Sequence, residues 1–116
     1  MSWHSLNKIS DNDWKITFGA ICSDKLLENY FTEYEEFISN QKQKIIIHFD
    51  LSNIQSITIL QILKNVFFLN KMKSIHKQNL SSFKLIIPNY YLSKLMVLTF
   101  ILSPPVVPCE IIENFT

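Results

Sequence analysis

The chain contains no arginine and only one glycine, and each shortage excludes classes of function. Without guanidinium groups it cannot make the bidentate contacts that read guanine or clamp phosphate groups. A formal net charge of +1 gives no strong positive field, so we expect no nucleic-acid partner. Gly19 alone builds no Gly-rich phosphate loop, dinucleotide-binding turn or Gly-x-Ser-x-Gly motif, so we expect that the protein is not an enzyme.

Cysteine and long apolar runs are also scarce. Cys22 and Cys109 lie far apart in the sequence, and residues 1–10 lack the apolar stretch of a secretory signal. This favours a cytoplasmic protein with reduced thiols over a disulfide. Two cysteines and three scattered histidines give no zinc spacing, so we expect no metal and no other cofactor. The longest apolar run, residues 95–102, is far shorter than the roughly 20 residues that span a membrane.

Apolar side chains are abundant, and they predict the fold. A 116-residue chain that is 47% hydrophobic and 18% charged predicts one folded domain, residues 1–116. Residues 44–51 predict its central strand, which alternates between an apolar face (Ile45, Ile47, Phe49, Leu51) and a mixed face (Lys44, Ile46, His48, Asp50). A sheet covered on both faces needs apolar residues on both, so we expect the helices mainly on one face.

The remaining segments complete an α/β order of β-β-α-β-α-β-α-β around a mixed sheet. The predicted strands are 3–9, 14–18, 44–51, 83–88 and 106–112, and the helices are 24–40, 57–75 and 90–103. Ser23, Ser56 and Asn89 are the predicted N-caps. Pro108 places the last strand at a sheet edge, because an edge strand can spare one N–H group. The acidic side of the first helix (Glu28, Glu33, Glu35, Glu36) is a solvated face or a docking surface for a basic partner.

Two helices carry candidate interaction residues. In the second, Ile59, Ile62, Leu63, Val66 and Phe67 form the predicted core stripe. Phe68, Met72 and Ile75 fall outside that stripe, which leaves two interpretations: the helix bends or is covered there, or the three form an exposed patch for a partner. The segment from Tyr90 to Ser103 is apolar nearly all round, as expected of a buried helix or of one at an oligomer or membrane interface.

The run Ile45 to Ile54, with the strand end Asp50-Leu51-Ser52 and the helix that follows, resembles the STAS domain of anti-sigma factor antagonists and sulfate transporter tails. Regulatory members carry an Asp-Ser-Ser-Gly run whose first serine is phosphorylated by a partner kinase. In register, Thr58 stands at the Asp and Ile59 at that serine, so the phosphorylation site is missing. Ser56 and Thr58 remain near the helix start, as helix caps or as sites where a phosphate would meet free N–H groups.

His48 and Asp50 share one strand face, where they are either a structural pair or part of a nucleophile set. The resemblance implies a non-catalytic protein-interaction module, and the apolar helix surfaces favour self-association. The alternative is a small-molecule or lipid-binding domain, which predicts a closed apolar pocket of several hundred cubic ångströms beside the third helix.

Overall fold

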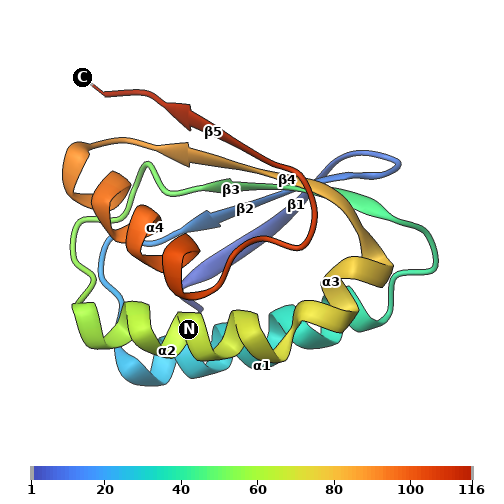
Figure 1. The fold of residues 1–116 in the computed structure, drawn as a ribbon, viewed down its shortest axis with the longest axis horizontal. Coiled ribbons are helices and arrows are strands. Elements are labelled where there is room, and N and C mark those ends of the chain that lie inside the picture. Colours follow the sequence, from blue (N-terminus) through green and yellow to red (C-terminus); the bar gives the residue numbers. More distant parts are fainter. Residues whose placement is uncertain (1, 116) are drawn as a thin grey trace.

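The computed structural model describes residues 2–115, in which five strands form one mixed sheet (Figure 1). The strands β1 (His4–Ser10), β2 (Asp13–Phe18), β3 (Ile45–Asp50), β4 (Leu80–Ile87) and β5 (Cys109–Glu113) lie side by side in that order. β1 and β2 are antiparallel, and every other neighbouring pair is parallel. The helices are α1 (Asp24–Ser39), α2 (Ile59–Lys71), α3 (Lys73–Asn79) and α4 (Tyr90–Leu102). The predicted α/β class with a mixed sheet is confirmed.

All four helices cover the same face of the sheet, as the alternation in β3 predicts (Figure 1). Ile45 and Ile47 are almost completely buried beneath them. The opposite face is open, and ion pairs between neighbouring strands join Lys15 with Asp50 at 3.3 Å and Lys84 with Glu110 at 3.7 Å. The His48 side chain contacts the Asp13 carboxylate at 3.5 Å on the same face. Such self-paired charges suit contact with water.

The hairpin of β1 and β2 is fixed by Trp3, whose indole N–H donates to the carbonyl of Gly19 at 3.0 Å. The Gly19 N–H donates in return to the carbonyl of Trp3, and a Cβ added at Gly19 would lie 3.4 Å from that oxygen. That distance is an ordinary van der Waals contact, so the two hydrogen bonds, and not the lack of a side chain at Gly19, explain this approach of two backbone segments. Behind this contact the Trp3 ring packs on Phe18 and Tyr30 in the core.

α1 and α4 begin at the predicted caps. The Ser23 hydroxyl accepts from the Leu26 N–H at 3.1 Å, and the Asn89 side chain accepts from the Leu92 N–H at 2.9 Å. β5 begins only at Cys109, because Pro104, Pro105 and Pro108 disfavour regular structure before it. β5 lies at the sheet edge as predicted, with Pro108 just outside it.

The second helix differs most from the prediction, because it bends at Met72 and continues as α3. The Met72 N–H is shared between the carbonyls of Phe68 and Leu69 at 3.0 and 3.1 Å, as in a tightened final helical turn. The bend and the neighbouring α1 together cover the residues outside the predicted stripe. Phe68 is 8% exposed, Met72 is 0% exposed and Ile75 is partly buried against the core. The interpretation of these three as an exposed patch is therefore wrong.

The predicted core stripe of this helix is also displaced around its axis. Ile62 and Val66 are buried as expected, but Ile59 and Phe67 point to solvent. Gln61, assigned to the polar side, is buried. The displacement arises because α2 lies between α1 and α4, so that its two flanks are covered and its outer side is open. This arrangement leaves apolar side chains on the outer side of the helix layer.

Candidate functional site

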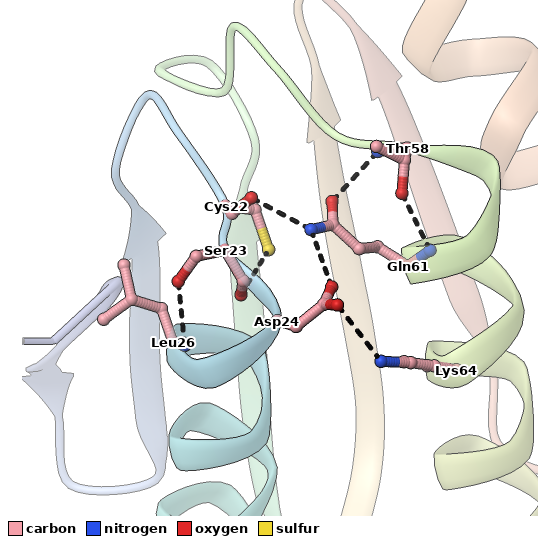
Figure 2. Close-up of polar contacts among 7 residues, drawn as sticks. All are labelled: Cys22, Ser23, Asp24, Leu26, Thr58, Gln61 and Lys64. Carbon is pink, nitrogen blue, oxygen red and sulfur yellow. Dashed lines mark hydrogen bonds and ion pairs between the residues drawn. The ribbon is translucent and has the colours of Figure 1, made fainter.

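The N-terminal ends of α1 and α2 lie side by side and are joined by a polar cluster (Figure 2). The buried amide of Gln61 donates to the carbonyl of Cys22 at 2.9 Å and to the carboxylate of Asp24 at 3.2 Å. Its oxygen accepts from the Thr58 N–H at 2.9 Å. One side chain thus satisfies backbone groups of two helix ends, and Asp24 also pairs with Lys64 at 3.6 Å. This cluster fixes the position of α2 against α1.

Thr58, not Ser56, is the N-cap of α2, so the predicted cap was displaced by two residues. The Thr58 hydroxyl accepts from the Gln61 N–H at 3.1 Å, which completes a reciprocal capping box. Ser56 contributes only backbone: it forms a bridge with Ile21, and its N–H donates to the carbonyl of Ala20. The hydroxyl oxygen of Thr58 is thereby engaged in the cap.

Replacing Thr58 by alanine is expected to lower the free energy of unfolding by about 1 kcal/mol, because the Gln61 N–H loses its acceptor. Ser56→Ala is the matched control, since it removes an exposed hydroxyl two residues earlier, and we expect no measurable change. Denaturant titration of both variants measures the difference. Equal losses, or a larger loss for Ser56→Ala, would contradict the assignment of the cap.

Cys22 lies within this cluster but is poorly suited to nucleophilic chemistry. Burial raises the pKa of its thiol to about 11, and the nearby Asp24 carboxylate acts in the same direction. At neutral pH the sulfur is therefore protonated, and a thiol is a weak nucleophile. Burial likewise raises the pKa of Cys109 to about 11.

The pair His48 and Asp50 is not brought together by the fold. His48 contacts Asp13, whereas Asp50 pairs with Lys15 and accepts from the Ser52 N–H at 2.9 Å. Within residues 2–115, no three side chains of His, Cys, Asp and Glu gather in a way that could hold a metal ion. The geometry therefore gives this pair structural partners on the open face of the sheet.

A buried polar pair lies under the bend between α2 and α3. The hydroxyl of Tyr34 on α1 and Nε2 of His76 on α3 are 2.7 Å apart, and the tautomer of the imidazole decides which of them donates. Burial lowers the pKa of His76 to about 4, so the ring is neutral at pH 7. Burial also raises the pKa of Tyr34 well above its ordinary value. The bend at Met72 carries His76 into the interior, which the sequence pattern did not predict.

The largest group of exposed apolar side chains lies on the outer sides of α2 and α4, and we call it the α2–α4 face. Its members are Ile59, Leu60, Phe67, Tyr90, Tyr91, Val97, Ile101 and Leu102. They are 46% to 74% exposed, whereas the inner side of each helix is buried. Five of them lie on α4, whose sequence also fits complete burial, so only the structure identifies their side as open: Tyr90, Tyr91, Val97, Ile101 and Leu102.

The two helices of this face are parallel neighbours. The Tyr91 hydroxyl donates to the carbonyl of Ile57 just before α2, and the Ser103 hydroxyl contacts Asn70 near the end of α2 at 2.8 Å. Neither helix contains an acidic residue. Lys64 and Lys71 on α2 are paired with Asp24 and Glu35 of α1. Lys94 on α4 lies over the ring of Tyr90, with its ammonium 4.7 Å from the ring centroid. The chemical character of the face is therefore mainly apolar, with a positive charge at Lys94.

Comparison of the chain with protein-family models, curated proteins and solved structures finds no match. Over residues 2–115, none of the helices combines the length and the apolar character that crossing a bilayer requires. The fold class and the two features described above, the polar cluster and the α2–α4 face, are the basis for a functional proposal.

Proposed function

We propose that this chain is a non-catalytic, cytoplasmic protein-interaction module of the STAS type, which self-associates through the α2–α4 face. The observation that carries the proposal is the concentration of exposed apolar side chains on two adjacent helices. Two supporting observations are the one-sided sheet and the free cysteine thiols, the second of which fits a reducing compartment.

The size of the face is sufficient for a stable contact between two chains. Eight large apolar side chains, each exposed over about half or more of its surface, offer on the order of 1,000 Å². A standard interface buries roughly 800 Å² per partner, and the largest apolar patch on a typical monomer is about 300–600 Å². A patch of this size favours a partner over contact with water.

Charge favours a second copy of this chain over an anionic membrane. α1 lies beside α2 in the same helix layer and carries five acidic residues and one lysine (Asp24, Lys25, Glu28, Glu33, Glu35, Glu36). These carboxylates would repel anionic lipid headgroups. A two-fold axis that seats α4 of each copy on α2 of the other buries the apolar side chains and leaves the acidic helices at the polar rim.

The resemblance to STAS domains gives this contact a regulatory meaning. In register, Ile59 occupies the place of the phosphorylated serine of the regulatory members, and it belongs to the α2–α4 face. An apolar residue cannot receive a phosphate, so the contact has no charge switch at this position. We propose association that does not depend on phosphorylation, with Ser56 and Thr58 serving only the local backbone.

Sedimentation equilibrium over a wide concentration range tests the proposal. We expect a dimer, and we expect Phe67→Lys or Ile101→Lys to raise its dissociation constant by about tenfold or more, because each places a charge in a buried contact. Ile9→Lys is the matched control, since Ile9 is 56% exposed but lies on β1. A wild-type chain that stays monomeric throughout, or one that instead co-sediments with phosphatidylserine vesicles, would reject self-association.

A further inference from the structure

A cavity of about 110 Å³ lies between the sheet and the helix layer. β4 contributes Phe83 and Leu85 to its wall, and α4 contributes Leu92, Met96 and Thr99. His76 of α3 and Tyr34 of α1, which face each other, also belong to the wall. The cavity lies beside α4, where a ligand pocket was predicted, but its volume is smaller than the several hundred cubic ångströms expected of a lipid site.

The exposed residues of the cavity wall come from two segments. One is Lys73 at the start of α3, and the other is Pro104 to Val106 in the loop between α4 and β5. The hydrogen bond from Ser103 to Asn70 holds the end of α4 beside the end of α2, so these two segments lie near each other. The opening to solvent is therefore placed between the start of α3 and the proline-rich loop.

The polar groups of the cavity wall differ in the number of hydrogen-bonding sites that remain free for a ligand. The Thr99 hydroxyl already donates to the carbonyl of Leu95 at 2.8 Å, and the Ser103 hydroxyl is engaged by Asn70. Tyr34 bonds only to His76 through its hydroxyl. A phenolic oxygen has one donor and two acceptor sites, so it retains a hydrogen-bonding site whichever tautomer the imidazole adopts. Tyr34 is thus a polar anchor in a mainly apolar wall, which also contains the polar side chains of Tyr30, Asn65 and Lys73.

We infer that this cavity binds a small, uncharged, single-ring molecule that carries one hydroxyl group, with the ring among the apolar side chains of β4 and α4 and the hydroxyl at Tyr34. An apolar cavity of about 150 Å³ in another protein stays dry and binds benzene or xenon, so a volume near this scale matches one ring. A charged ligand is disfavoured in the buried part of the cavity, because Tyr34 and the neutral His76 offer it no opposite charge and burial of an unpaired charge is costly. Lys73, the cation of the wall, is exposed at the opening.

Phenol and benzene are the probes, titrated into the full chain and followed by NMR of methyl and amide groups. Binding is expected to shift the methyl signals of Leu85, Leu92 and Met96, which line the cavity. Tyr34→Phe is expected to weaken phenol binding about tenfold and to leave benzene binding unchanged, because only phenol uses the hydroxyl. A general loosening of the core would change both affinities together.

Thr99→Leu adds apolar volume to the cavity and removes only a hydroxyl that bonds within its own helix, and it is expected to abolish binding of both probes. If this variant fails to fold, the titration of the wild-type chain still tests whether the cavity binds the probes. Shifts confined to exposed residues of the α2–α4 face, such as Ile101, or no shifts at millimolar phenol, would overturn the inference. A wild-type chain that does not self-associate would contradict the proposed function but not the inferred ligand site, because the cavity lies on the inner side of the helices.

Discussion

Replacing Gln61 by glutamate is expected to destabilise the fold by about 3 kcal/mol at pH 7, because a carboxylate would replace the amide that joins two helix ends. The amide nitrogen donates to the carbonyl of Cys22 and to the carboxylate of Asp24, and a carboxylate has no proton to donate. A negative group at the buried position 61 would then face the exposed carboxylate of Asp24. Chemical denaturation of the variant and the wild type measures the difference (Figure 2).

The destabilisation of the Gln61→Glu variant relative to the wild type is expected to decrease as the pH falls. Burial beside Asp24 raises the pKa of the new carboxyl in the folded state, so the destabilisation is present above that pKa and shrinks as the pH falls through it. Gln55→Glu is the matched control: it makes the same substitution at an exposed position in the loop before α2, and we expect almost no effect. A loss below about 1 kcal/mol, or one that does not change with pH relative to wild type, would contradict the role of Gln61.

The fold is expected to become less stable as the pH falls from about 6.5 towards 4, because His76 is buried in its neutral form beside Tyr34. Burial lowers the pKa of folded His76 to about 4, whereas the unfolded chain binds the proton near 6.5. Between these values the unfolded state binds more protons, so the stabilisation is complete above pH 6.5 and is lost as the pH falls through this window. A pKa shift of this size corresponds to a loss of about 3 kcal/mol in the free energy of unfolding across the whole window.

His76→Gln isolates this contribution, because glutamine can place a hydrogen-bonding group near Tyr34 but does not titrate. We expect the free energy of unfolding of this variant to fall less between pH 7 and pH 4.5 than that of the wild type. His4 also lowers the free energy of unfolding as the pH falls, in the variant and in the wild type alike, because burial lowers its pKa as well. Parallel pH profiles for the two proteins would show that His76 is not buried in its neutral form.

Local signals predicted most of the fold. Ser23 and Asn89 cap their helices through hydroxyl and amide groups that act within one turn, and the alternation in β3 identified the covered face of the sheet. Thr58 could also have been identified, because Thr58 and Gln61 have the spacing of a capping box whereas Ser56 has isoleucine three residues later.

The α2–α4 face could not be located from the pattern alone. Which side of α2 is buried depends on α1 and α4, which pack on its flanks, and on the bend at Met72. The Phe31 ring stacks on Phe68 at 4.3 Å, and this contact across helices turns Phe68 inward and Phe67 outward. A helical period describes spacing along one element, whereas neighbours in space decide which side of it is covered.

The hairpin holds both tryptophans of the chain, and this determines what intrinsic fluorescence can report. Trp3 is buried against Phe18, and Trp14 packs against Phe37 of α1, at the end of the sheet opposite β5. Emission will therefore follow docking of the hairpin on α1, while events on the outer side of α4 alter the signal little. Tyr90 and Tyr91, exposed on α4, are the better optical probes there, and a tryptophan introduced at either position would report on that half of the molecule.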